Sequence, residues 1–314
     1  MDILFTFKIK DEQIAQLRSD FPSIQFSFTK DIRETNIEKY EVIVTYGEDI
    51  DNAILERAKS LKWVMVASAG VDQMPLLEMA DRGIVVTNVS GIHKTPMAES
   101  VLAHILSLCR GLLALYKQQE RKDWNTRIRL KELRGSTALI LGPGAIGSEI
   151  GRLLQAFGVK TIGCNRSGRQ AEFIDEMIVF DALLERLPQA DYVISVLPST
   201  KETKGLWTEE HFKAMKETAV FMNFGRGDLV SEEIIVSALQ ENLIAHAVLD
   251  VFENEPLPES SLLWDLPNVT VSPHISSHSG KYIERSLEIF TYNLRKWIAG
   301  EKDMKNGIDA EKGY

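Results

Sequence analysis

Three short segments of this 314-residue sequence combine a charged side chain with glycine or proline, and each follows an apolar run. The first holds Arg226 between Gly225 and Gly227, the second holds Glu255, and the third holds His274 after a proline. A guanidinium stays charged and presents a planar fork that matches a carboxylate, whereas an imidazole exchanges protons near neutral pH. These residue types could together bind an anion and transfer a proton, although a lone Arg, Glu or His is more often a surface charge.

A glycine-rich turn, Gly142-Pro143-Gly144-Ala145-Ile146-Gly147, matches the pattern G-x-G-x-x-G. The apolar run 138–141 before it predicts a strand, and residues 146–157 after it have the apolar spacing of a helix. In this context Gly142 permits the tight turn, Gly144 lets backbone approach a pyrophosphate, and Gly147 allows close helix–strand packing. We predict that a dinucleotide binds here, contacted also by Ala145 and Ile146; a glycine-rich turn without a ligand is the alternative.

The residues after the next predicted strand, 160–164, bear on the choice of dinucleotide. NAD-specific folds place Asp or Glu there to accept from the ribose hydroxyls. This sequence has Asn165, Arg166 and Ser167 instead, followed by Arg169. The two arginines could bind a 2′-phosphate, with Ser167 as a further donor. The sequence therefore favours NADP(H), while NAD(H) remains possible and solvated loop arginines are the simpler alternative.

Short apolar runs alternate with helical patterns along the whole chain. Such alternation indicates βα units, and continuously apolar strands are typical of parallel sheets covered on both faces. We therefore predict an α/β fold with two Rossmann-like domains, parallel sheets and an interdomain cleft. The strands are expected at residues 3–5, 42–44, 63–66, 84–86, 138–141, 160–164, 192–197, 220–223, 245–249 and 269–271.

One long helix is expected from Pro96 to about Trp124, with Thr95 as its N-cap. Residues 98–115 are apolar nearly all round, which predicts burial between domains or between subunits. We accordingly predict a homodimer. The polar tail from residue 302 is expected to be poorly ordered unless it docks.

The composition excludes several classes of protein. A net charge of −9 disfavours nucleic acid and anionic membranes as partners. The sequence offers no Cys/His cluster for a metal, and Cys109 and Cys164 are expected to be buried small hydrophobes. It also shows no signal-peptide pattern and no long uncharged run, so the expected location is the cytoplasm.

The ordered set of motifs resembles the D-isomer-specific 2-hydroxyacid dehydrogenases. The resemblance runs from Ser68-Ala69-Gly70-Val71-Asp72 through the glycine-rich turn, G-R-G and D-V-F-x-x-E-P to P-H-I. It implies that Arg226 binds the carboxylate and keto oxygen of a substrate, and that His274 is the acid and base. It also implies that Glu255 pairs with His274, favours the imidazolium and fixes the tautomer.

The same resemblance implies further contacts. Backbone at Ala69, Gly70 and Val71 would meet the substrate carboxylate, Thr95 the nicotinamide half of the cofactor, and Asp250 its carboxamide. Residues expected along the cofactor in addition are Leu197, Pro198 and Thr203 on the adenine side, and Phe224, Gly225 and His274.

The expected domains are a substrate domain, residues 1–94 plus 280–314, and a dinucleotide domain, residues 95–279. The expected function is hydride transfer between NAD(P)H and a small 2-keto or 2-hydroxy acid of the D series, of the glyoxylate or hydroxypyruvate reductase type. The alternatives are an NAD enzyme like phosphoglycerate dehydrogenase, and a non-catalytic dinucleotide-sensing protein on the same fold.

Overall fold

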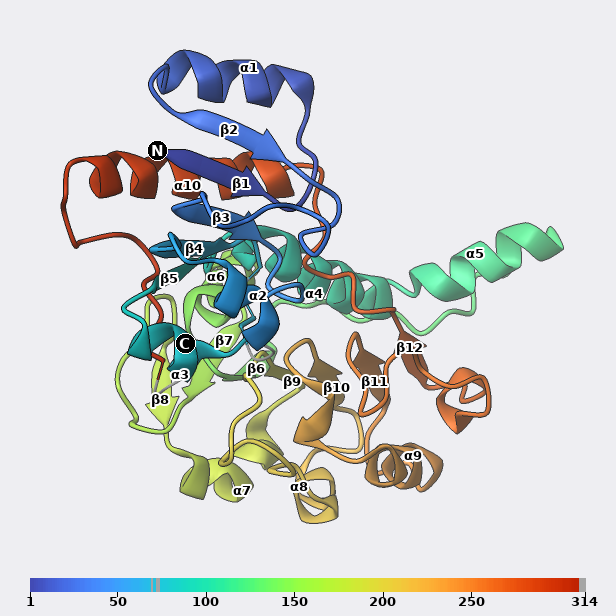
Figure 1. The fold of residues 1–314 in the computed structure, drawn as a ribbon. Helices are drawn as coiled ribbons and strands as arrows, with labels where there is room; N and C mark the ends of the chain where they lie inside the picture. Colours follow the sequence, from blue (N-terminus) through green and yellow to red (C-terminus); the bar gives the residue numbers. More distant parts are fainter. Residues whose placement is uncertain (69, 72–73, 311–314) are drawn as a thin grey trace. The chain divides into compact units, whose positions relative to one another are not determined.

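The computed structural model describes residues 1–68, 70–71 and 74–310. The chain divides into two compact units, one formed by Met1–Ile92 with Ser279–Tyr314 and the other by His93–His278 (Figure 1). The predicted boundaries at 94/95 and 279/280 fall beside these divisions, and the assignment of substrate and cofactor to the two units stays a prediction.

The first unit contains a five-stranded sheet in the order β2-β1-β3-β4-β5, with every pair parallel. Alternate strand residues enter two separate cores, one shared with α2 and α3 and the other with α1 and α10. The sheet is therefore covered on both faces, as its continuously apolar strands predict. The elements are β1 (Asp2–Phe5), α1 (Asp11–Asp20), β2 (Gln25–Phe28), β3 (Val42–Thr45), α2 (Asn52–Arg57), β4 (Trp63–Val66), α3 (Leu76–Asp81), β5 (Val85–Asn88) and α10 (Tyr282–Ile298).

The described segment after α10, residues 299–310, docks on its own unit, which is the exception that the expectation of a poorly ordered tail allowed. The Asn293 side chain of α10 donates to the Lys305 carbonyl at 3.0 Å and accepts from its N–H at 2.7 Å. Ile308 N–H then donates to Val86 O at 2.9 Å, and Gly307 forms an antiparallel bridge with Thr87. Strand β5 is the edge of its sheet, so its free backbone groups provide the docking site.

The second unit contains a seven-stranded, fully parallel sheet in the order β12-β11-β10-β9-β6-β7-β8. Helices α4 and α6 cover one face, and α7, α8 and α9 pack with the core on the other. The elements are α4 (Lys94–Cys109), α5 (Leu112–Arg121), β6 (Thr137–Leu141), α6 (Ala145–Ala156), β7 (Lys160–Cys164), β8 (Glu176–Ile178), α7 (Leu183–Arg186), β9 (Tyr192–Ser195), α8 (Glu209–Ala214), β10 (Val220–Asn223), α9 (Glu232–Gln240), β11 (His246–Leu249) and β12 (Val269–Val271), with 3-10 turns at Phe180–Ala182, Leu187–Gln189, Gly227–Leu229 and Leu262–Trp264.

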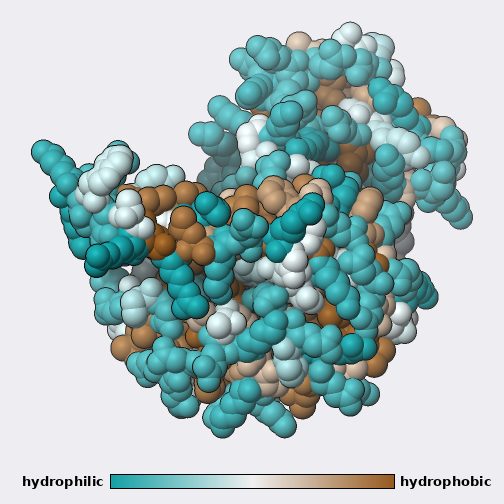
Figure 2. Space-filling view, turned by 180° about the vertical axis from the view of Figure 1, so that it is seen from behind, coloured by the Kyte–Doolittle hydropathy of each residue, from teal (hydrophilic) through white to brown (hydrophobic). Residues whose placement is uncertain are grey.

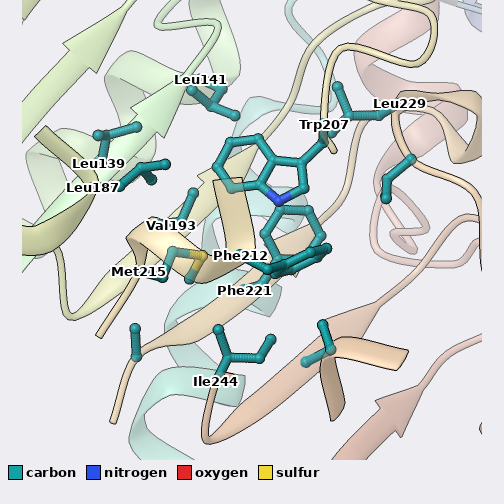
Figure 3. Packing of buried hydrophobic residues seen from close by; sticks show 14 of the residues in the cluster. Leu139, Leu141, Leu187, Val193, Trp207, Phe212, Met215, Phe221, Leu229 and Ile244 are labelled. Carbon is teal, nitrogen blue, oxygen red and sulfur yellow. The ribbon is translucent and has the colours of Figure 1, made fainter. Parts of the chain in front are cut away.

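Aromatic packing fills the core on the α8 side of this sheet. The Trp207 ring contacts Phe221 at a centroid distance of 5.1 Å, and Phe212 meets Phe221 edge-on at 5.2 Å (Figure 3). Both cysteines are free and buried, as predicted, and Cys109 Sγ lies 2.9 Å from Tyr192 Oη. The predicted α/β fold with parallel sheets is therefore confirmed.

The single helix predicted from Pro96 to Trp124 is wrong. The chain forms α4 and α5, which are bent by 62° relative to one another. Gly111 lies between them at φ 60, and a Cβ there would come within 2.8 Å of Ile128 Cγ2, so the break requires glycine. Thr95 is not the N-cap either, because α4 begins at Lys94 after His93. No single helix of the described residues is long and apolar enough to cross a membrane, and α4 with α5 would qualify by length and composition only as this bent pair.

Candidate functional site

The glycine-rich turn lies where the direction of strand order reverses in the second unit. Strand β6 has β9 on one side and β7 on the other, and the turn leaves its carboxyl end toward α6. In open parallel sheets this switch point is where ligands bind. A cavity of about 940 Å³ opens there, lined by the turn, by the loop after β7 and by residues 196 and 198 after β9. The predicted dinucleotide turn therefore borders a real cavity.

The three glycines of the turn occupy three different environments. Gly142 has φ 85, a conformation that glycine adopts without strain. A Cβ at Gly147 would lie 2.6 Å from the Gly142 carbonyl oxygen, so helix and strand approach too closely for any side chain. A Cβ at Gly144 would meet nothing within 4 Å, and Gly144 lines the cavity. The open backbone at Gly144, at the start of the long helix α6, suits an anionic pyrophosphate.

The loop after β7 brings cationic side chains to the same cavity. Asn165 Nδ2 donates to Arg169 O at 2.9 Å, and Ser167 N–H donates to Asn165 Oδ1 at 3.1 Å, which closes the loop on itself. Arg166 and Arg169 line the cavity, and neither forms an ion pair within the described residues. Arg166 lies close enough to Glu202 to help the Thr200 hydrogen bond lower the pKa of that carboxyl.

Some predicted cofactor residues line this cavity and others do not. Ala145 and Pro198 line it together with the turn glycines Gly142 and Gly144. The Ile146 side chain instead packs against the core shared with α4. Gly147, as described, serves helix packing. The contacts of Ala145 and Ile146 with a cofactor stay predictions, but only the former has its side chain at the cavity wall.

The residues predicted on the adenine and nicotinamide sides of the cofactor mostly contact the protein's own core or turns. Leu197 and Phe224 are buried, at 6% and 2% exposure. Thr203 Oγ1 donates to Pro198 O at 2.6 Å and so shapes the turn after β9. Thr95 is absent from the cavity lining, which holds its neighbour Lys94 instead. Contact of these residues with a cofactor remains a prediction.

Sequence reasoning missed several residues of the cavity wall. Lys94 adds a cation from the first position of α4, next to the predicted Thr95. Ser148 and Glu149 belong to the first turns of α6, where adjacency to Gly147 could have indicated them. The segment 170–173 carries no motif, and only the fold brings it to the cavity.

The structure brings two of the three predicted catalytic residues together. His274 Nδ1 lies 2.8 Å from Glu255 Oε2, and their side chains are 47% and 35% exposed. The other carboxylate oxygen, Oε1, accepts from Phe252 N–H at 3.0 Å, which orients Glu255 from within its own loop. A carboxylate held in this way engages Nδ1 and leaves Nε2 of the imidazole as the outward nitrogen.

Arg226 lies in the same unit but makes no hydrogen bond or ion pair with that His–Glu pair in the described part of the chain. Its Nη1 donates to Gly225 O at 2.9 Å, and the side chain is partly buried. The flanking glycines are required by space: a Cβ at Gly225 would lie 2.4 Å from Leu197 O, and one at Gly227 1.9 Å from Phe252 O. Both glycines therefore leave room for neighbouring backbone at Leu197 and Phe252.

His93, which sequence analysis did not single out, lies near this arginine. It is 8% exposed, and burial lowers its pKa, with smaller contributions in the same direction from His278 and Arg226. A hydrogen bond with the Ser277 backbone opposes this lowering of the His93 pKa without reversing it. A neutral second histidine is therefore part of the region that holds Arg226.

The predicted substrate loop belongs to the first unit. Ala69 lies outside the described residues, Gly70 is partly exposed, and Val71 is 3% exposed in the core shared with α2 and α3. Val71 O accepts from Met74 N–H at 3.0 Å. Binding of a substrate carboxylate by these backbone amides stays a prediction.

A parallel sheet with a glycine-rich turn at its switch point, two arginines lining the adjoining cavity and a His–Glu pair fit the class of NAD(P)-dependent oxidoreductases. Residues 102–276 match the family model described as D-isomer specific 2-hydroxyacid dehydrogenase, NAD binding domain. The chain belongs to the D-isomer-specific 2-hydroxyacid dehydrogenase family.

Named relatives and solved structures agree with this assignment. The chain is 33% identical over 288 residues to a glyoxylate reductase of Thermofilum pendens, covering 90% of this chain and 84% of that one. It is 30% identical to the glyoxylate reductase/hydroxypyruvate reductase of Mus musculus, covering 93% and 89%.

Three solved structures are similar over nearly the whole chain. A D-isomer specific 2-hydroxyacid dehydrogenase family protein from Aeromonas salmonicida has TM-score 0.88 and 33% identity, with 98% and 99% covered. A phosphoglycerate dehydrogenase from Lactobacillus plantarum has TM-score 0.60 and 32% identity, with 98% and 100% covered. A family member from Xanthobacter autotrophicus, in complex with NADPH and MES, has TM-score 0.83 and 26% identity, with 100% and 99% covered.

Proposed function

We propose that this enzyme reduces a small 2-keto acid of the glyoxylate or hydroxypyruvate type to the D-2-hydroxy acid, with NADPH as the preferred cofactor. The observation that carries the proposal is the His274–Glu255 hydrogen bond of 2.8 Å, because it assembles a proton donor whose outward nitrogen can face a keto oxygen. Relatives at 30% and 33% identity bear the names glyoxylate reductase/hydroxypyruvate reductase and glyoxylate reductase, which supports the substrate class.

Each residue of the proposed mechanism has one task. A nicotinamide held at the cavity would supply the hydride. Arg226 binds the substrate carboxylate with its guanidinium fork and holds the keto carbon in place. His274 gives the proton from Nε2 to the developing alkoxide, and Glu255 accepts from Nδ1–H, holds the tautomer and stabilises the imidazolium.

The substrate is tested by initial rates with glyoxylate, hydroxypyruvate, pyruvate and phosphohydroxypyruvate, each with NADPH and with NADH. We expect the highest kcat/KM for glyoxylate or hydroxypyruvate. The Lactobacillus plantarum structure favours a second candidate, a phosphoglycerate dehydrogenase-like NAD enzyme. Preference for phosphohydroxypyruvate with NADH would establish that candidate in place of the first.

The cofactor preference rests on Arg166 and Arg169 at the cavity and on the absence of a carboxylate at positions 165–167. The Xanthobacter autotrophicus relative in complex with NADPH supports it. Arg166→Ala should weaken the binding of NADPH by about 1.5–3 kcal/mol and the binding of NADH far less, since only NADPH offers a 2′-phosphate. Arg127→Ala, an exposed arginine outside the cavity lining, is the control. Equal losses for both cofactors, or a wild type that prefers NADH, would refute the preference.

The role of Glu255 is tested by Glu255→Gln. The variant keeps an acceptor oxygen near His274 but loses the charge that favours imidazolium. Because Glu255 orients the imidazole that gives the proton, kcat for reduction should fall about tenfold while the Kd of NADPH changes little. An unchanged kcat would mean that Glu255 does not couple to the acid.

We also propose that the chain forms a homodimer through α4 and α5. Among the described residues α5 contributes none to the core, and Leu113, Leu115 and Tyr116 are 50%, 42% and 60% exposed. In Figure 2, α5 lies at the left edge and carries hydrophobic residues beside hydrophilic ones. Exposed apolar clusters of this kind mark interaction surfaces. Sedimentation at micromolar concentration should give a dimer and Leu113→Asp should shift it toward monomer; a monomeric wild type would contradict the proposal.

A further inference from the structure

The backbone of the proposed acid is in an uncommon conformation. His274 has φ 52, in the left-handed region that few residues other than glycine adopt, although histidine does so more often than most. Its side chain is 47% exposed, so the imidazole is held by its hydrogen bond to Glu255 and not by burial. The backbone of the turn around His274 is held by hydrogen bonds of the neighbouring residues.

Asp250 makes the contacts that fix this turn. It follows β11 directly and is fully buried. Its Oδ1 accepts from Ser272 Oγ at 2.6 Å and from Ile275 N–H at 3.1 Å. Its Oδ2 accepts from Ser276 N–H at 3.1 Å. One carboxylate thus binds the chain two residues before His274 and both residues after it.

Helix α4 and His93, the residue before it, bind the far end of the same turn. Ser100 Oγ donates to Ser276 O at 3.3 Å, and His93 hydrogen-bonds with the Ser277 backbone. Ser276 is therefore bonded at its N–H to Asp250 and at its carbonyl to Ser100. His104, also on α4, faces Asp250 closely enough for the carboxylate to oppose the lowering of the His104 pKa that burial causes.

The network requires a carboxylate because every partner of Asp250 is a donor. A carboxylate has two acceptor oxygens with about four lone-pair sites, of which the turn uses three. An asparagine would turn its NH₂ toward an N–H or O–H, leaving a buried donor without an acceptor. The hydrogen bonds of the Asp250 side chain all go to the turn, and its contact with a cofactor carboxamide stays a prediction from resemblance.

From this geometry we infer that Asp250 is a positioning residue, which acts through Ser272 and the amides of Ile275 and Ser276 to hold His274 where it can protonate the substrate. The inference rests on the role proposed for His274. It predicts that weakening the network lowers kcat while the affinity for cofactor is retained.

The first test removes one hydrogen bond at the turn. Ser272→Ala should lower kcat about tenfold, because small displacements of a catalytic group have large effects on rate. KM for the keto acid and the Kd of NADPH should change less than twofold. Ser272→Thr, which restores a hydroxyl, should recover most of the rate. Ser237→Ala is the matched control, since Ser237 Oγ also donates to a carboxylate, Glu241 Oε1 at 2.9 Å, but on the exposed surface of α9.

The second test follows the histidine without turnover. Imidazole NMR signals of the wild type are assigned with His274→Gln, and Ser272→Ala should shift or broaden the His274 signal while Ser272→Thr and Ser237→Ala leave it in place. Asp250→Asn should produce the larger change in the same signal. If it fails to fold, the two Ser272 variants still decide.

Binding of NADPH and of 2′,5′-ADP, which lacks the nicotinamide, separates the two roles of Asp250. A carboxamide contact predicts that Asp250→Asn weakens NADPH alone and that Ser272→Ala changes neither kcat nor the His274 signal; that pattern would overturn the inference. A wild type without activity on any keto acid would refute the proposed function, while the NMR comparison would still test the positioning of His274.

Discussion

The cofactor cavity and the His274 turn are built in opposite ways. At the cavity, one contiguous stretch, residues 142–145, contributes backbone that glycine leaves open, and residues of α4, α6 and the loops after β7 and β9 complete the lining. At the His274 turn, side chains from separate segments converge: Asp250 after β11, Glu255 five residues later, and His274 after β12. The comparison suggests a difference to test: loss of one lining side chain should weaken the cofactor contact that it makes, whereas the turn should depend on all of its partners together.

The largest effect is expected when the turn loses its acid. His274→Ala should lower kcat by about 10²–10⁴, because no other group replaces the proton donor. The cavity shares none of this chemistry, so NADPH should bind with nearly the wild-type Kd. Steady-state kinetics and fluorescence titration measure the two quantities, and a parallel loss of cofactor affinity would show that the regions are not independent.

A substitution at the anion-binding residue should act on substrate affinity. Arg226→Lys replaces a bidentate fork by a point charge, so KM for the keto acid should rise by about 10–100-fold with a smaller change in kcat. The Kd of NADPH serves as the control. An unchanged KM would contradict carboxylate binding by Arg226.

Two glycines of the cavity allow a matched comparison. Gly147→Ala places a Cβ 2.6 Å from Gly142 O, so it should destabilise the fold by about 1–3 kcal/mol and also weaken cofactor binding. The Cβ of Gly144→Ala would meet nothing within 4 Å, so this variant should weaken cofactor binding without loss of stability. Urea unfolding and NADPH titration measure both effects. Equal destabilisation by the two variants would refute the distinct roles of these glycines.

The smallest effect concerns His246, at the opposite end of β11 from Asp250. Burial, with a smaller effect of His104, lowers the pKa of His246 to about 4. Its unfolded pKa is about 6.5, so between those values the unfolded chain takes up a proton that the folded chain does not, and stability falls as pH falls. Between pH 7.5 and 4.5, the free energy of unfolding of His246→Gln should therefore fall by about 1–2 kcal/mol less than that of the wild type, as measured by urea unfolding. Equal losses would mean that another group governs the acid limb.

Much of the fold followed from pattern alone. The strands predicted at 63–66, 160–164, 220–223 and 269–271 coincide with β4, β7, β10 and β12, since continuously apolar runs bounded by turns are strong signals. Two edge elements were missed: β2 alternates polar and apolar residues, and β8 has only three residues. Each is stabilised by its neighbour in the sheet, which local sequence does not reveal.

The sequence by itself determined the α/β class, the glycine-rich turn and the residues proposed for catalysis, because these depend on residue type and short spacing. Only the tertiary structure decided which predicted residues meet. Register between β11 and β12 pairs Leu249 with Val271, and this places Asp250 beside Ser272 and lets Glu255 reach His274. Contact between distant segments also explains the break after α4, where the side chains of Ile128 and Leu130 pack against Gly111. Contacts between segments distant in sequence depend on packing of the whole unit, and no local pattern encodes that packing.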